Sequence, residues 1–299
     1  MKKTIFMLTA AIMLAACEKL EIPSDEEAEK GGEQTEVTGT RKFTFTVKGD
    51  FSSPTFSDGE QTRAGYLQAD EKDMTDLWVF DYMGSGCVQT LHQTADDDTW
   101  GKPTLTLAYG SHHVYFVASR GDNPALDAEG HVITWGIPRD TFWKDYQMDV
   151  VSTSNGNRAV TLDRVATRLR LLVKDEVPAG CASVTISPEK WLYGWDYVAG
   201  VAMASQHSER VISVPSSYIG TAGTLSLSIY GFSDGEEWAT DVSVLAKDVD
   251  GNVLGRVTIE NAPFKPNRST EYSGNLFRSS GAVNLVLNDT WSDAITGDW

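Results

Sequence analysis

Residues 248–252 carry side chains that could bind a metal ion, because Asp, Asp and Asn stand at positions 1, 3 and 5, as in a calcium loop. The match then fails. Position 6 is Val253, where such a loop needs glycine, and position 12 is Ile259, where it needs a bidentate glutamate. His112 and His113 are adjacent, so on a strand they point to opposite faces and cannot chelate one ion together. We therefore predict no metal site, and a hairpin turn at residues 248–252.

Catalytic chemistry finds little support in the sequence. It contains no HExxH, Walker or GxGxxG motif. Carboxylate pairs are too common among 42 Asp and Glu residues to single out a glycosidase pair. The net charge of −17 argues against nucleic acid, whose phosphates need Lys and Arg. The sequence predicts a protein that is not an enzyme, needs no cofactor and binds no nucleic acid.

An aromatic set follows Pro188 and offers a different kind of site. Trp191, Tyr193 and Trp195 stand at alternate positions, with Tyr197 two residues further on. Flat aromatic side chains stack well on sugar rings, so this set could form a glycan platform. The alternative is that these side chains pack between two sheets, and the sequence leaves both interpretations open.

The N-terminal residues predict export and a lipid anchor. Lys2 and Lys3 precede an apolar run at residues 5–16, which is too short to cross a bilayer and ends in Leu-Ala-Ala before Cys17. This pattern resembles a bacterial lipoprotein signal, so we expect residues 1–16 to be removed and Cys17 to be acylated. Acyl chains would hold the protein on its membrane.

Residues 17–40 are acidic and poor in large apolar side chains, which predicts a linker that forms no core. The acidic residues after Cys17 also resemble the signal that sends lipoproteins of Bacteroidetes to the outer face of the outer membrane. The other two cysteines, Cys87 and Cys181, are predicted to be either a disulfide or two small buried thiols.

The rest of the chain shows the strand period rather than a helical one. Phe43, Phe45 and Val47 alternate with threonines, and similar short runs recur between turn signals such as Asn155-Gly156 and Asp250-Gly251. Only residues 140–147 suggest a short helix. These features predict an all-β protein of β-sandwiches, with further strands at residues 77–80, 104–108, 113–118, 147–151, 159–162, 169–173, 183–187, 198–202, 211–214, 224–230, 241–246, 253–259 and 282–287.

Several segments taken in order resemble the fimbrillin-type lipoproteins of Bacteroidetes, the subunits of type V fimbriae, with the anchor and accessory branch most similar. They lie at residues 62–64 (Thr-Arg-Ala), 76–81 (Asp-Leu-Trp-Val-Phe-Asp), 162–168 (Leu-Asp-Arg followed by Ala166 and Arg168) and 261–277 (Asn-Ala-Pro-Phe-Lys-Pro-Asn-Arg-Ser-Thr-Glu-Tyr-Ser-Gly-Asn-Leu-Phe), followed by residues 283–287 and Trp291. With the lipoprotein signal, the resemblance spans nearly the whole chain.

This resemblance implies two consecutive transthyretin-like β-sandwich domains of about seven strands each, which we place at residues 41–165 and 166–299. It also implies assembly by strand exchange after a protease cuts behind a basic residue. The matching position is Arg63, with Ala64 as the new N-terminus, and less favourably Arg41; the alternative is that Arg63 is a loop residue of an anchor that is not cleaved. The strands that could be exchanged are those of Phe43, Phe45 and Val47 and of Val283, Leu285 and Leu287.

The function implied is that of a surface-exposed structural subunit of type V fimbriae, as anchor, accessory or tip, in cell adhesion. Its partners would be other fimbrial subunits, the outer membrane through the lipid anchor, and a glycan or protein of a host or bacterial surface. The alternative is a glycan-binding surface lipoprotein of a nutrient-uptake system, with Trp191, Tyr193 and Trp195 as its platform.

Overall fold

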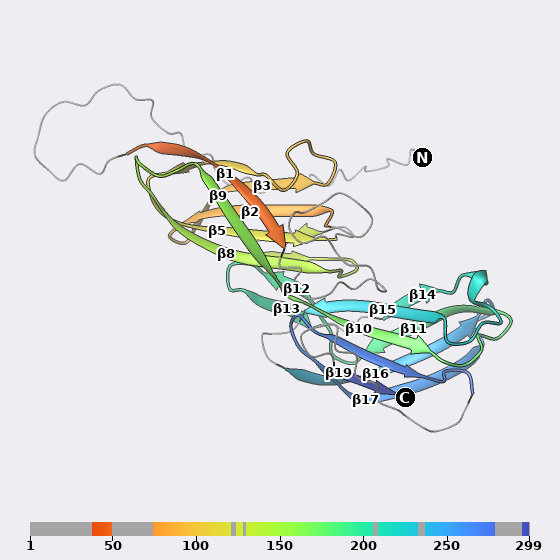
Figure 1. Ribbon diagram of the computed structural model, residues 1–299. Coiled ribbons are helices and arrows are strands. Elements are labelled where there is room, and N and C mark those ends of the chain that lie inside the picture. The colour runs from red at the N-terminus through yellow and green to blue at the C-terminus, as the bar shows by residue number, and fades with distance from the viewer. Residues whose placement is uncertain are drawn as a thin grey trace, which may run out of the picture.

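The computed structural model describes residues 38–49, 74–120, 124–127, 130–205, 209–232, 237–278 and 295–298. These residues form 19 strands and one short 3₁₀ turn, η1 (Ser216–Tyr218), and no α-helix. The prediction of an all-β protein is confirmed. Figure 1 shows the strands gathered into two halves, with the first strands in one half and the C-terminal strands in the other.

The N-terminal half is a sandwich made by one folded-over sheet of seven strands, in the order β3-β2-β5-β8-β9-β1-β4. Strands β8 and β9 pair over only two residue pairs, so the sheet bends there and its two parts face each other across an apolar core. The strands are β1 (Thr40–Gly49), β2 (Asp76–Met83), β3 (Gly86–Thr94), β4 (Thr104–Ala108), β5 (Gly110–Ser119), β8 (Thr141–Val150) and β9 (Asn157–Arg164).

The C-terminal half has two sheets that enclose a second core. The larger has the order β19-β18-β10-β15-β12-β7-β6, with β13 beside β12, and the smaller has the order β14-β11-β16-β17. The strands are β6 (Ala125–Leu126), β7 (Val132–Thr134), β10 (Ala166–Val173), β11 (Cys181–Pro188), β12 (Leu192–Asp196), β13 (Val201–Ser205), β14 (Arg210–Ser213), β15 (Leu225–Phe232), β16 (Trp238–Asp248), β17 (Val253–Phe264), β18 (Ser269–Gly274) and β19 (Ile295–Asp298).

The part of the chain before residue 165, where we placed the domain boundary, contributes two strands to the C-terminal half. Strands β6 and β7 precede this boundary in the chain, yet β7 pairs with β12 and extends the sheet of the C-terminal half. The chain itself crosses between the halves at Val165, the single residue between β9 and β10. A third apolar cluster fills the space between the halves and includes Phe80, Tyr115, Trp195, Tyr197 and Phe232.

Strands β1 and β10 have the same arrangement of neighbours in their sheets. Strand β1 lies between β4, to which it is antiparallel, and β9, to which it is parallel. Strand β10 likewise lies between β15, antiparallel, and β18, parallel. Strands β1 and β10 are therefore interior strands, and the loss of either would expose two neighbours.

The apolar patterns in the sequence follow from burial on one face or on two. Phe43, Phe45 and Val47 alternate with polar residues because only one face of β1 meets the core. The unbroken run at residues 77–80 arises because β2 is covered on both faces: Leu77 and Val79 lie in the N-terminal core, and Phe80 lies in the cluster between the halves.

The turn predicted at residues 248–252 is confirmed as the β16–β17 hairpin. Gly251 has a φ of 85°, which favours glycine, and the Asp248 carboxylate accepts hydrogen bonds from the backbone N–H groups of Asp250 and Asn252. These hydrogen bonds lower the pKa of Asp248, the largest effect being that of the Asn252 side chain. The carboxylate therefore caps a turn.

Two local predictions are wrong. Residues 140–147 contribute to strand β8 instead of a helix, because all ten residues of β8 pair with β5 and this pairing outweighs local preference. Asn155-Gly156 does not form a turn with positive φ. A side chain at position 156 would meet the backbone oxygen of Lys42 at 2.6 Å, so glycine is needed there to let β1 approach.

Several strands escaped prediction because their local pattern is weak or short. These include β3, β12 and β18, and β13 begins only at Val201, after a turn at residues 197–200 that we had assigned in part to a strand. The strand expected at residues 282–287 lies outside the described part of the chain.

Candidate functional sites

Strand β1, which the resemblance marks as exchangeable, is an interior strand with a deeply buried face. Phe43, Phe45 and Val47 are fully buried. The ring of Phe45 lies 5.3 Å from Phe116 and 6.0 Å from Tyr146, edge to face in both cases. The three side chains thus lie in the apolar core between the two layers of the N-terminal sandwich.

The neighbours of β1 define what its removal would leave. Phe43 lies opposite Leu105 of β4, and Val47 lies opposite Val160 of β9. Without β1, the backbone N–H and C=O groups on the facing edges of β4 and β9 would lack partners, and unpaired strand edges recruit another strand. The arrangement can therefore act as a strand acceptor if β1 departs.

Most other residues of the predicted assembly sites lie outside the described residues: Cys17, Arg63, Ala64, Val283, Leu285 and Leu287. Arg41, the second candidate for cleavage, is described and lies within β1 opposite Leu107. A protease needs an unpaired, extended backbone, so cleavage at Arg41 would require β1 to detach first. This placement makes Arg41 the poorer candidate.

The predicted aromatic platform is divided between two cores instead of forming one exposed surface. Trp191 is 2% exposed and packs in the C-terminal core, with its ring 5.0 Å from Phe264. Trp195 is 5% exposed and packs between the halves against Trp143 and Phe232. Only Tyr193 is partly exposed. Three alternate residues separate in this way because Trp191 precedes β12 and does not share the face of Trp195.

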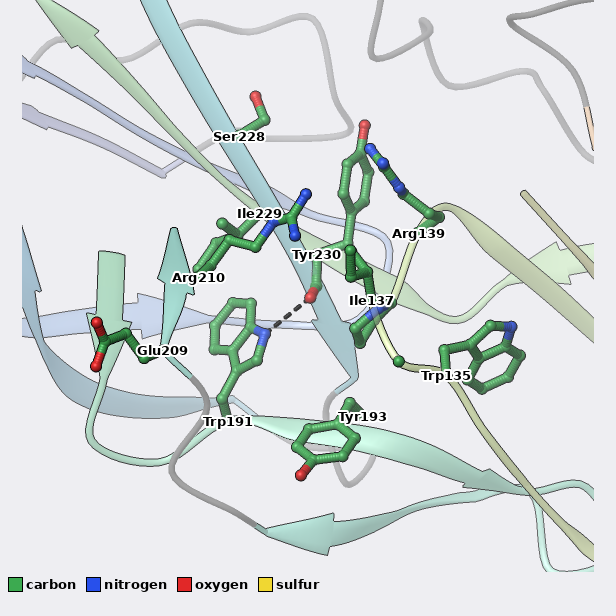
Figure 2. A pocket seen from close by; sticks show the side chains of 12 residues that line it. Trp135, Ile137, Arg139, Trp191, Tyr193, Glu209, Arg210, Ser228, Ile229 and Tyr230 are labelled. Atoms are coloured by element: carbon green, nitrogen blue, oxygen red, sulfur yellow. Dashed lines mark hydrogen bonds between the residues drawn. The ribbon is translucent and has the colours of Figure 1, made fainter. Parts of the chain in front are cut away.

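A cavity of about 290 Å³ lies in front of Trp191 and Tyr193. Figure 2 shows that it is assembled from four distant segments: the connection from β7 to β8, the start of β12, the start of β14 and the end of β15. The Trp191 indole N–H donates a hydrogen bond to the backbone oxygen of Tyr230 at 2.8 Å and so fixes the wall of the cavity. Its lining also includes Ile137, Arg139, Glu209, Arg210, Ser228 and Ile229.

Sequence reasoning found two residues of this cavity and missed its cationic ones. Arg139 lies in the connection from β7 to β8, and Arg210 is the first residue of β14, so the fold alone brings both to the cavity. No local spacing links them, so a sequence pattern could not have indicated the pair.

A network of buried charges lies where the halves join. Arg164 Nε donates to Asp140 Oδ1 at 3.0 Å, and Arg168 Nη2 donates to Glu271 Oε1 at 3.0 Å. Burial raises the pKa of Asp140, an effect that Arg164 opposes, and burial lowers the pKa of Arg168. Each pair lies within one half, beside the β9–β10 crossing, and Arg164 Nη1 also donates to Asn267 Oδ1 at 3.5 Å, which links the halves.

The two adjacent histidines point to opposite faces, as predicted, and His112 is fully buried. Its Nδ1 lies 2.7 Å from Asp81 Oδ1 and its Nε2 lies 2.9 Å from the backbone oxygen of Ala108. Both partners accept hydrogen bonds, so both ring nitrogens must donate, which requires the doubly protonated, cationic imidazole. Burial lowers the pKa of His112, but the hydrogen bond and charge of Asp81 outweigh it, and the net pKa is raised.

We predict a pH-dependent stability from this pair. Because the folded-state pKa of His112 exceeds its ordinary 6.5, the contribution of the pair is fully present below about pH 6.5 and is lost as pH rises through the raised value. We expect the Asp81→Asn variant to lose about 2 kcal/mol at pH 6 and less at pH 9, measured by urea unfolding. The matched control is His113→Gln, at the half-exposed pair with Asp145. An equal loss at both pH values for Asp81→Asn would contradict the charged pair.

Metal and membrane sites find no support in the described part of the chain. Over those residues, no three or more His, Cys, Asp or Glu side chains gather closely enough to hold a metal ion. No helix there has the length and apolar character needed to cross a membrane. Cys87 and Cys181 are thiols in different halves, and burial raises the pKa of Cys181.

Known proteins offer only distant likenesses. No family model matches the chain, and no curated protein matches it. Solved structures with a similar arrangement include a candidate adhesin from Bacteroides ovatus (12% identity, 73% of this chain and 77% of the other, TM-score 0.49). Others are a fimbrial assembly protein from Parabacteroides distasonis (10%, 81% and 94%, 0.46) and the fimbrial anchor protein Mfa2 from Porphyromonas gingivalis (7%, 75% and 84%, 0.42). At these identities and TM-scores the likenesses carry no argument about fold or function.

Proposed function

We propose that this protein is a surface lipoprotein that serves as a structural subunit of type V fimbriae, as anchor, accessory or tip, and assembles with other subunits by β-strand exchange in cell adhesion. Before any cleavage at Arg63 it would be held on the outer membrane through acylated Cys17 and would face the cell exterior. No catalytic step, cofactor or nucleic acid enters this role.

The observation that carries the proposal is the buried, interior position of strand β1. Phe43, Phe45 and Val47 are fully buried on an interior strand that is followed in the chain by Arg63. Cleavage after Arg63 would separate β1 covalently from all later strands. A strand from a neighbouring subunit could then pair with β4 and β9 through its backbone and fill the same pockets with alternate side chains.

The sequence supports the membrane part of the proposal. The charged start, the apolar run at residues 5–16 and the small residues before Cys17 fit export and acylation. The acidic residues 17–40 suit a solvated tether between the lipid and the folded halves.

The alternative, glycan capture on a flat platform of Trp191, Tyr193 and Trp195, has less support. Two of these side chains are buried in different cores, and replacing either with alanine would damage the fold before it tested binding. A ligand would have to use the cavity beside Tyr193 instead.

We predict that protein recovered from its native cell surface after assembly begins at Ala64. Cleavage at Arg63 leaves β1 attached only through hydrogen bonds and side-chain packing, so the next subunit can replace it. Intact mass and N-terminal sequencing measure this directly. The Arg63→Ala variant is expected to keep its N-terminal segment and to stay out of fibres.

The matched control is Arg41→Ala, which removes the other basic candidate and should leave maturation unchanged. A surface protein that still begins at lipidated Cys17 would contradict cleavage and leave only an anchor role. A protein cut after Arg41 would contradict the assignment of the site to Arg63.

A further inference from the structure

The cavity beside Tyr193 lies apart from the proposed strand-exchange site. Its walls come from the β7–β8 connection and from β12, β14 and β15, and no residue of β1, β4 or β9 lines it. Its volume of about 290 Å³ is close to the lower end of small-molecule pockets, roughly 300 Å³. A site of this size takes a group about as large as one sugar ring.

Two arginines give the cavity a positive character in a strongly acidic protein. Arg139 and Arg210 both line it, and in Figure 2 their guanidinium groups lie on either side of the Tyr230 side chain. Guanidinium groups match the planar geometry of a carboxylate and bind it through paired hydrogen bonds. Glu209, which is exposed, is the acidic residue among those lining the cavity, so the lining carries two cationic side chains and one anionic one.

The remaining wall is apolar, aromatic and rigid. Trp191 is held by its hydrogen bond to the Tyr230 backbone and by its packing on Phe264. Any side chain at Gly231 would meet Trp191 at 2.5 Å, so glycine there lets the indole sit against the sheet. Tyr193, Ile137 and Ile229 complete the apolar surface. Such a wall suits the C–H face of a sugar ring.

We propose that this cavity binds a carboxylated sugar residue of the uronic acid type. The carboxylate would lie at Arg139 and Arg210, and the ring would lie against Tyr193 and the Trp191 wall. This role goes beyond that of a structural subunit, and it does not depend on cleavage at Arg63 or on strand exchange.

Isothermal titration calorimetry of the purified protein tests the proposal, with glucuronic acid as the probe and glucose as its neutral counterpart. We expect glucuronic acid to bind with a Kd of about 1 mM and glucose to bind at least tenfold more weakly. Arg210→Gln and Arg139→Gln should each weaken glucuronic acid binding about tenfold without lowering the unfolding temperature. A short oligogalacturonide distinguishes a chain-bound uronate from the free sugar by binding more tightly if neighbouring residues also make contact.

The matched control is Arg256→Gln, which removes an exposed arginine of β17 that does not line the cavity. Its affinity for glucuronic acid should equal that of the unaltered protein. The proposal is overturned if glucuronic acid and glucose bind equally, if neither binds at 10 mM, about ten times the expected Kd, or if a folded arginine variant binds as well as the control. Since the cavity is intact in the uncleaved chain, these outcomes leave the fimbrial proposal untouched.

Discussion

A chain that begins at Ala64 is expected to associate with itself, or with any added copy of β1, because it lacks an interior strand. The loss of Phe43, Phe45 and Val47 removes three fully buried side chains, each worth roughly 1.5–3 kcal/mol. Their sum is comparable to the whole stability of an ordinary domain, about 5–15 kcal/mol. The exposed edges of β4 and β9 add unpaired backbone groups.

Size-exclusion chromatography and thermal unfolding of residues 64–299 measure this effect. A synthetic peptide of residues 38–50 should bind, raise the unfolding temperature by about 10 °C or more and suppress self-association. The matched control is the same peptide with Phe45→Asp, which keeps the backbone but places a charge in the pocket beside Phe116. A truncated chain that stays monomeric, unfolds at the original temperature and ignores both peptides would show that β1 is dispensable.

The Tyr197→Ala variant is expected to weaken the contact between the two halves so that they unfold independently. Tyr197 is fully buried, its ring stacks on Phe80 at 3.8 Å, and its hydroxyl donates to the backbone oxygen of Gly130. Removing a large buried aromatic side chain costs about 4 kcal/mol. Because Phe80 belongs to the N-terminal half and Tyr197 follows β12 of the C-terminal half, calorimetry should show two unfolding transitions instead of one.

The matched control for this interface is Tyr197→Phe. It keeps the stack on Phe80 and removes only the hydroxyl, which also lies 3.2 Å from that of Tyr82. We expect a loss of about 1–2 kcal/mol and a single transition. Equal losses for the two variants would mean that the hydrogen bonds, and not the stacking, hold the halves together.

The sequence predicted the strands whose two faces differ and missed much of what depends on distant partners. Phe43, Phe45 and Val47 could be assigned both to a strand and to its inner face, because polar residues alternate with them. The run at residues 77–80 could be assigned to a strand, but its burial on both faces depends on Tyr197, which lies far away in the sequence.

Short or mixed segments could not be predicted for the same reason. Strand β7 has only three residues and exists through its pairing with β12. Residues 140–147 carry Trp143, Lys144 and Asp145 in succession, which gives no alternation, and pairing with β5, together with a short pairing to β9, makes them a strand. The cavity could not be predicted because Arg139 and Arg210 line it together only in the folded chain. The spacing of Trp191 and Trp195 likewise did not indicate that they are buried in separate cores.

The crossing at Val165 has a mechanical consequence. Strand β9 ends at Arg164 and β10 begins at Ala166, so there is no slack between the halves, and the Val165 N–H is itself bonded to the Thr141 oxygen. Tension along the chain would pass directly from strand β9 to strand β10. Strand β9 pairs in parallel with β1, and β10 pairs in parallel with β18. The load would therefore act on many hydrogen bonds at once, in shear, and the protein would resist stretching.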